Sequence, residues 1–211
     1  MVTDDWDRVR ELLRRTKKTT KSRYRASERL ERHHKFSQWS VALLSCALIF
    51  IPLVQVFDVH TIIPNDVLSL TQAVLAVLVL VYSLLLGQED FILRSSNMHK
   101  NGVELGRYAR KLAGFNGSVV EDDQYSQLVE EYYNILEKYE NHKPVDYLYT
   151  QLSDKPKTLV DWPLYVLTGL KAYLTSLLIY SHYFIIMFLA SSVFIHLVTA
   201  MLVTSKVVQQ Q

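Results

Sequence analysis

Catalytic or metal chemistry needs a reactive side chain beside a base, or several ligands at short spacing, and this sequence offers neither. The single cysteine, Cys46, lies in an apolar stretch with no histidine near it. His33 and His34 are adjacent on an expected helix, so they cannot easily face one metal ion. His182 and His196 have no acidic partners, and no phosphate-binding loop or dinucleotide fingerprint occurs. The sequence therefore predicts a protein that is not an enzyme and that has no cofactor and no metal site.

Uncharged polar residues inside two apolar stretches are better candidates for function. The second stretch carries Ser69, Gln72 and Ser83 on roughly one helical face, and the first contributes Ser45 and Gln55. Such a polar face costs free energy in lipid and favours contact with water or with another helix. Two interpretations stay open: these side chains line a pore formed by several copies, or they pack one helix against another.

Basic residues are concentrated near the N-terminus, where about half of all lysines and arginines precede Lys35. The candidates for contact with an anionic partner are Arg14, Arg15, Lys17, Lys18, Lys21, Arg23 and Arg25. This cluster suits nucleic acid or anionic lipid. The alternative, which we favour, is a solvated helix whose charge sets the membrane topology. The formal net charge of the chain is only +2, so it says little about partners.

A seven-residue repeat after the second apolar stretch predicts a seam between helices. Phe91, Met98, Leu105 and Leu112 recur every seven residues, and Gly102 belongs to a neighbouring line of small residues. A stripe of large residues beside a stripe of small ones suits close helix approach. We therefore expect these five residues to form a seam between copies of the chain.

Two uncharged stretches, residues 39–57 and 67–87, hold the polar candidates. Each is about 20 residues long, enough to cross ~30 Å of hydrocarbon as a helix. Residues 58–66 between them contain Pro64 and no lysine or arginine, which suits a tight turn. Basic residues flank the pair on both outer sides, so the positive-inside rule places both ends of this hairpin, and the N-terminus, in the cytoplasm.

The charged sequence around this hairpin predicts helices outside the membrane. Residues 1–38 predict a basic cytoplasmic helix, because they contain no glycine or proline. Residues 88–140 predict a cytoplasmic helical hairpin of residues 88–112 and 121–139, with a turn at 116–117. Two prolines and mixed polarity over 141–157 indicate an extended stretch, and residues 150–158 are the linker between a 1–149 domain and the C-terminal part.

The C-terminal region, residues 159–205, contains more than 30 consecutive residues without a formal charge. One perpendicular helix of that length would overshoot the bilayer. We expect an interfacial piece at about 159–173, carrying Trp162 and Lys171, and then a third span at about 176–203. A span over 160–180 would bury Lys171, which is costly, and a soluble core helix is the remaining alternative. The predicted fold is an all-α integral membrane protein with a two-span hairpin, a cytoplasmic helical hairpin and a C-terminal apolar helix as third span.

Two short segments carry a resemblance to a known family. The segment RSSNMHKNGVELGRYARKL, with Asn97, His99 and Leu105, follows the second span at once, and ENHKPVDYLY covers Glu140 to Tyr149. Together with the basic helix and the hairpin, they resemble the SLATT family, the SMODS- and SLOG-associating two-transmembrane effectors of bacterial conflict systems. The resemblance covers roughly residues 5–149, and the long C-terminal apolar run departs from a bare two-span hairpin.

The resemblance implies an antiphage defence effector in the bacterial inner membrane. Family members are thought to assemble as homo-oligomers and to open a pore or otherwise damage the membrane, so that an infected cell dies or stops growing. The implied trigger is an operon-encoded sensor, which is a nucleotidyltransferase, a SLOG protein or a reverse transcriptase.

Two functions fit these features. The leading hypothesis is an oligomeric, gated membrane pore. The alternative is a membrane-anchored adaptor that forms no pore and recruits a cytoplasmic partner or nucleic acid through its basic N-terminal helix. Ion flux distinguishes them, since an adaptor gives none. A small transporter comes last, because the first two spans hold no charge.

Overall fold

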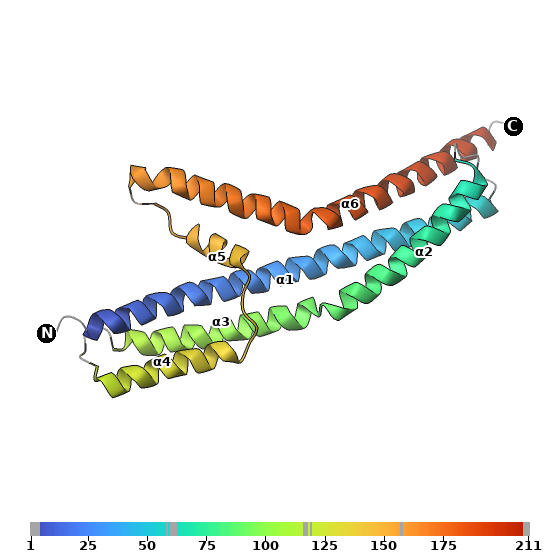
Figure 1. The fold of residues 1–211 in the computed structure, drawn as a ribbon. Coiled ribbons are helices and arrows are strands. Elements are labelled where there is room, and N and C mark those ends of the chain that lie inside the picture. The colour runs from blue at the N-terminus through green and yellow to red at the C-terminus, as the bar shows by residue number, and fades with distance from the viewer. Residues whose placement is uncertain are drawn as a thin grey trace. The chain divides into compact units, whose positions relative to one another are not determined.

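The computed structural model describes residues 5–57, 59, 63–115, 118, 120–156 and 158–208, without the side chains of 5–7 and 204–208. The described chain is helical throughout its regular elements (Figure 1), which confirms the all-α prediction. The elements are α1 (Asp5–Val56), α2 (Asn65–Gln88), α3 (Phe91–Ala113), α4 (Asp122–Glu137), α5 (Pro144–Gln151), the short 3₁₀ helix η1 (Leu159–Asp161) and α6 (Trp162–Val208).

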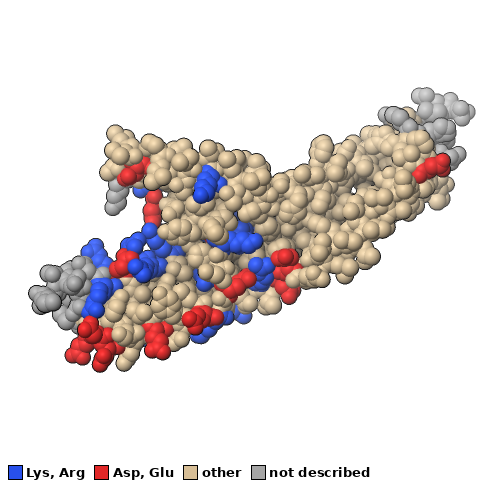
Figure 2. All heavy atoms as spheres, in the orientation of Figure 1, with Lys and Arg blue, Asp and Glu red and all other residues tan. Residues whose placement is uncertain are grey.

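The chain divides into two compact units, and α1 and α6 each contribute to both. Residues 1–32 and 91–177 form one unit, and residues 33–90 and 178–211 form the other. Of the charged residues, the second unit contains only Lys35, Asp58, Asp66, Glu89, Asp90 and Lys206. We call the first the charged unit and the second the apolar unit, and on the face that Figure 2 shows, acidic and basic side chains gather on the charged unit.

Helix α1 joins two segments that the sequence predicted separately, the basic helix and the first apolar stretch. Its 52 residues contain no glycine and one proline, Pro52, so nothing before that position stops the helix. Helices α2 and α3 are separated by a break at Asp90, which has a φ of 42°. Aspartate tolerates this left-handed conformation better than most residues, and helix α3 therefore begins at Phe91, not at the predicted residue 88.

In the charged unit, α3 runs antiparallel to both α1 and α4. Towards α4, Asn101 donates to the carbonyl of Ile135, and Tyr108 donates to that of Leu128. Towards α1, Tyr24 contacts His99 near the start of α3. Val9 and Leu12, earlier in α1, pack near the end of α3, so these two helices are also antiparallel. The largest cluster of buried residues lies where the three helices meet: Val9, Leu12, Leu105, Tyr108, Leu112, Val120, Leu128 and Tyr132.

In the apolar unit, the second part of α1 runs antiparallel to α2 and parallel to the last part of α6. Ile51 and Val54 of α1 pack with Leu68 of α2 and Leu197 of α6. Aromatic pairs follow the α1–α6 contact, among them Phe50 with Phe194, whose ring centroids lie 4.6 Å apart. This arrangement positions the polar residues of the two predicted spans on neighbouring helices.

The apolar unit presents large apolar side chains outward. Val77, Leu80 and Leu84 of α2 are each about 60% exposed, and only 6% of the most apolar 18-residue window within Asn65–Ala113 is buried. In water such a surface is rare on a monomer, whereas lipid covers it without cost. By length and composition, the described residues contain three helical segments able to cross a membrane, within Arg8–Val56, Asn65–Ala113 and Leu159–Val203.

One prediction about the C-terminal third was wrong. Residues 141–157 were expected to be extended, but helix α5 occupies Pro144–Gln151. Pro144 stands at the start of this helix, where no backbone donor is needed, and the Asp146 carboxylate accepts from the backbone N–H of Lys143 at 2.9 Å. The interfacial piece and the third span that the sequence predicted lie on one helix, α6, with Pro163 in its first turn.

Candidate functional site

A buried ion pair joins α1 to α5 in the charged unit. The Arg29 guanidinium donates from Nε to Oδ1 of Asp146 at 2.8 Å and from Nη2 to Oδ2 at 3.1 Å. The two side chains are 9% and 1% exposed. This two-point geometry is the strongest form of the arginine–carboxylate contact. Removing one partner would leave the other charge buried and alone, which typically costs about 3–5 kcal/mol.

Asp146 also closes the first turn of α5. Its Oδ2 accepts both from Arg29 and from the backbone N–H of Lys143, while the Asp146 carbonyl accepts from the Thr150 hydroxyl. Thr150 in turn lies 3.0 Å from the hydroxyl of Ser22 on α1. One carboxylate therefore both caps α5 and fastens it to α1, so the helix and its attachment depend on the same charge.

A second buried arginine, Arg23, faces the segment between α4 and α5. It is 2% exposed, and its Nη1 donates to the carbonyl of Glu140 and lies 3.6 Å from the sulfur of Met98. The carboxylate of Glu140 is bound elsewhere, by Arg94 at 2.9 and 3.2 Å. Burial lowers the pKa of Arg23, and the charges of Glu140 and Asp146 offset part of this effect.

His142 lies between these two arginine contacts in sequence. Its Nδ1 is buried without a hydrogen-bond partner among the described residues. Burial lowers the pKa of His142, the charge of Arg23 lowers it further, and Asp146 opposes the shift. The ring is therefore neutral at physiological pH. We call Arg23, Arg29, Glu140, His142 and Asp146 the polar latch.

Helix α1 makes polar contacts beyond the polar latch. The face of α1 that lies inside the charged unit carries hydroxyls, among them Thr16 and Ser22, which are fully buried. Further along, Ser27 and Ser95 of α3 lie 3.0 Å apart through their hydroxyls. Because α1 attaches to its neighbours through polar as well as apolar side chains, a purely hydrophobic pattern could not show its buried face.

The stripe predicted as an oligomer seam packs inside the chain. Met98, Leu105 and Leu112 are at most 1% exposed, and Phe91 packs against the cluster that contains Met98. At Gly102, an added Cβ would come within 2.9 Å of the Tyr24 ring. Met98, Leu105 and Leu112 are therefore buried by α1 and α4 of the same chain, and of the large residues in the stripe only the half-buried Phe91 keeps surface for a second copy.

The basic residues proposed to contact an anionic partner are mostly engaged within the chain. Arg14 and Arg15 both bond Glu11, and these bonds, first that of Arg14, lower the pKa of Glu11 to about 2. Lys21 pairs with Asp154, Arg25 pairs with Glu28, and Arg23 is buried in the polar latch. Lys17 and Lys18 remain without such a pair among the described residues. Of these seven residues only Arg23 is buried, and Arg14 and Arg15 share the one charge of Glu11 while more than half exposed, so positive charge stays at the surface of this helix.

The five polar residues of the apolar stretches divide into two groups. Gln55 donates to the hydroxyl of Ser69 at 2.9 Å and to the carbonyl of Asn65 at 3.2 Å, so this pair packs α1 against α2. Gln72 and Ser45 are half-buried and Ser83 is exposed, and none of the three side chains has a hydrogen-bond partner among the described residues. The packing interpretation thus fits Gln55 and Ser69, and the pore interpretation stays open for the others.

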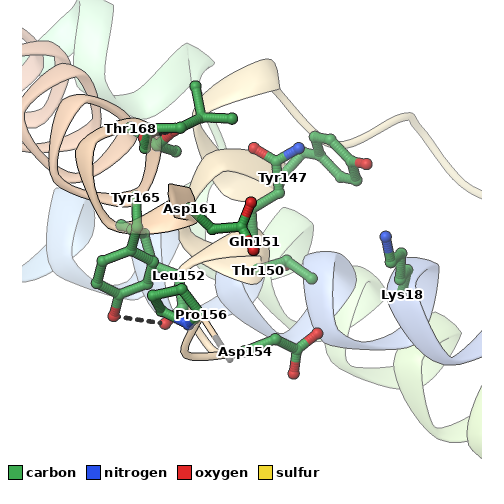
Figure 3. A pocket seen from close by; sticks show the side chains of 11 residues that line it. Lys18, Tyr147, Thr150, Gln151, Leu152, Asp154, Pro156, Asp161, Tyr165 and Thr168 are labelled. Atoms are coloured by element: carbon green, nitrogen blue, oxygen red, sulfur yellow. Dashed lines mark hydrogen bonds between the residues drawn. The ribbon is translucent and has the colours of Figure 1, made fainter. Parts of the chain in front are cut away.

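A cavity of about 410 Å³ lies beside α5 in the charged unit (Figure 3). It is lined from α1 by Lys18, from the segment after α5 by Asp154, and from η1 and α6 by Asp161 and Tyr165. The Tyr165 hydroxyl donates to the carbonyl of Leu152 at 3.2 Å. One ammonium and two carboxylates line the same space, so the cavity has both signs of charge.

Sequence reasoning missed the polar latch, although it singled out the segment that contains most of it. Arg29 and Asp146 are 117 positions apart, and no local periodicity connects them. The NHKPVDY stretch carried the family resemblance, and its aspartate after a lysine and a proline is a cap signal that could have revealed α5. That Asp146 pairs with Arg29 could be known only from the folded structure.

Comparison with known families gives one match. The profile described as SMODS and SLOG-associating 2TM effector domain family 5 matches residues 6–195. The match therefore extends beyond the predicted 1–149 domain and includes the cavity, the polar latch and most of α6. Comparisons with curated proteins and with solved structures give no match.

Proposed function

Since the chain belongs to family 5 of the SMODS- and SLOG-associating two-transmembrane effectors, and is thus a membrane effector of conflict systems, we propose that it acts by opening a pore. In this proposal several copies assemble in the bacterial inner membrane, with the N-terminus in the cytoplasm, and a partner sensor triggers opening. Depolarisation then stops growth of an infected cell. The oligomer, the pore and the sensor are the steps that experiments must establish.

The observation that carries the pore proposal is the uncovered surface of α2. Large apolar side chains cover most of this surface, yet it also holds the exposed Ser83. The half-buried Gln72 borders it, and neither polar side chain has a partner among the described residues. A polar group in hydrocarbon without a partner costs free energy. An assembly in which α2 of each copy faces a shared water-filled axis would satisfy these groups, while the apolar side chains face lipid and neighbouring copies.

The polar latch supplies a candidate for the gate. It fastens α5 to the first part of α1, and α1 continues without a break from the charged unit into the apolar unit. A sensor that binds the charged unit better with α5 released would shift the population towards the released state. Because α1 is one continuous helix, release of Arg29 from Asp146 would be transmitted along α1 to the spanning segment that packs against α2.

The alternative function is a membrane-anchored adaptor that recruits a partner through its basic helix. Arg23 is buried and does not offer its charge to nucleic acid, whereas Arg14, Arg15 and Arg25 form exposed pairs within the chain. A protein partner would not need a free basic face, so the adaptor remains the second candidate. It predicts no ion flux under any condition.

Membrane potential in growing bacteria tests the pore proposal. The chain would be induced alone and together with its operon neighbour and activating signal, while a voltage-sensitive dye reports the potential before growth falls. The proposal expects depolarisation that precedes growth arrest and that is reduced by Gln72→Leu and Ser83→Leu. The matched control is Thr199→Leu in α6, whose hydroxyl bonds only carbonyls of its own helix.

The gate is tested by exchanging the charges of the polar latch. Arg29→Asp and Asp146→Arg each place like charges together, and the proposal expects depolarisation without the activating signal. The double exchange restores opposite charges but not the carboxylate that caps α5, so it should return part of the dependence on the signal. If the double variant depolarises cells without the signal as strongly as either single variant, the ion pair does not control gating. A steady potential in cells that received the signal would refute the pore itself.

A further inference from the structure

In the first part of α6, small and polar residues face the protein and large apolar residues face outward. Within the charged unit, its protein-facing side carries small and polar residues, including Thr168, Gly169 and Ala172. Tyr149 of α5 reaches this side, where its hydroxyl lies 2.7 Å from that of Ser176 and donates to the carbonyl of Ala172 at 3.3 Å. A Cβ on Gly169 would lie 3.7 Å from Leu152, an ordinary contact. Small residues therefore bring the α6 backbone close to α5.

The opposite side of the same segment is large, apolar and uncovered. Leu159 and Val160 of η1 are 87% and 86% exposed. Along α6 the outward residues are Leu164, Val166, Leu167, Leu170, Tyr173 and Leu174, each about half exposed or more. From Trp162 to Val203 the only lysine, arginine or acidic residue is Lys171, which is also exposed.

This distribution is the opposite of that on a helix packed in a water-soluble protein. There the large apolar residues face the core and the polar residues face water. Helices that pack within lipid place small residues at the contact and large apolar residues outward, because hydrocarbon solvates the latter. The charged unit therefore contains a segment, residues 159–177, that is built for contact with lipid.

The length of α6 and the types of its residues indicate the depth of this contact. A helix of 47 residues is ~70 Å long, more than twice the ~30 Å hydrocarbon thickness. Residues 178–203 continue the same uncharged helix and suffice for the span. Residues 159–177 carry the aromatic side chains Trp162, Tyr165 and Tyr173 and the charge of Lys171, which belong at the membrane–water interface.

We propose that residues 159–177 form a membrane-surface element whose outward face lies in the interfacial region of the lipid bilayer. Its continuity with the candidate span makes lipid the occupant of this face. The element also holds α5 through Tyr149 and the following segment through Tyr165. The membrane surface is thereby connected to the helix that carries Asp146 of the polar latch. The inference needs a membrane protein but no pore.

Depth-dependent quenching of Trp162 tests this proposal on the full chain. The chain contains three tryptophans, at positions 6, 39 and 162. A Trp6→Phe, Trp39→Phe variant leaves Trp162 as the only tryptophan, excited selectively over the tyrosines, in vesicles of phosphatidylethanolamine and phosphatidylglycerol. Quenching lipids would carry their label either near the headgroup or near the end of the acyl chain. We expect a blue-shifted emission that the shallow label quenches several-fold more strongly than the deep one.

Two sets of controls make the result specific. The variant that keeps only Trp6 reports the charged start of α1 and should be unquenched by either label. In the Trp162-only background, Leu164→Asp with Leu167→Asp should shift the emission of Trp162 to the red and remove most of the quenching. Tyr133→Asp, on an exposed position of α4, adds a charge elsewhere on the charged unit and should change neither.

Three outcomes would overturn the proposal. Water-like emission without quenching would show that no lipid contacts this face. Stronger quenching by the deep label would place Trp162 in the hydrocarbon core, so that residues 159–177 would belong to a span. A blue-shifted but unquenched emission, with cross-linking between copies at Leu167→Cys in a Cys46→Ser background, would assign the face to a second copy. Failure to find a conductance would overturn only the pore.

Discussion

At the scale of single residues, the molecule depends on a few side chains that serve two purposes at once. The Asp146 carboxylate caps α5 and binds Arg29, and it does so at 1% exposure. Surface ion pairs of the charged unit, such as Lys21 with Asp154, have similar distances but remain in contact with water. Loss of the buried ion pair should therefore cost more stability than loss of the exposed one.

Replacing Asp146 by Asn should destabilise the charged unit by about 3–5 kcal/mol, because it leaves the Arg29 guanidinium buried without its counter-charge. The control is Asp154→Asn, which removes an exposed pair and should cost less than about 1 kcal/mol. Thermal unfolding in detergent, followed by the loss of helical circular dichroism, measures both. Equal losses for the two variants would contradict the structural importance of the buried pair.

His142 should make stability depend on pH. Its pKa is lowered in the folded chain, so below the ordinary histidine value of 6.5 the unfolded chain binds a proton that the folded chain does not. Stability from this group is therefore fully present above that value and is lost as the pH falls below it. Melting temperatures between about pH 8 and about pH 5.5 should drop less for His142→Gln than for the natural chain. An identical drop in both would exclude His142 as the cause.

At the scale of elements, the sequence was sufficient where signals are local. The absence of glycine and proline predicted a helix in α1, and the seven-residue repeat of α3 marked a closely packed face. Helix α5 was missed because its proline was taken as a break and not as a first turn. The pairing of α3 with α4 was predicted as a hairpin. The packing of α3 against α1 and the pair of Arg29 with Asp146 could not be predicted, because they connect segments distant in the chain and compete with equally plausible contacts between copies.

The close approach of α1 and α3 gives a prediction at Gly102. Gly102→Leu should destabilise the charged unit by about 1–3 kcal/mol, since its side chain would overlap the Tyr24 ring. Gly106→Ala is the matched control on the same helix, where a Cβ meets only Thr20 at 3.9 Å and the gain in helix propensity is up to ~1 kcal/mol. Combining Gly102→Leu with Tyr24→Ala should recover part of the loss in thermal unfolding. A double variant less stable than the sum of the two single changes would argue against this contact.

At the scale of the whole molecule, charge separates along the chain into one unit that suits water and one that suits lipid. The sequence predicted this separation, since charges are absent from residues 39–57 and 67–87. The charged unit also contains residues 159–177, which break the separation and give that unit a lipid-facing side. An effector with this organisation can receive a signal in the charged unit and act in the membrane, because α1 and α6 belong to both.

Single-channel recording of the purified chain in a planar lipid bilayer tests the pore most directly. The account predicts discrete current steps once the Arg29→Asp variant, or the natural chain with its activating partner, is incorporated. Ser83→Leu should reduce the step size without preventing incorporation, whereas Thr199→Leu should leave it unchanged. Incorporated protein that passes no current in either activated form would contradict the pore and leave the membrane-anchored adaptor as the function to pursue.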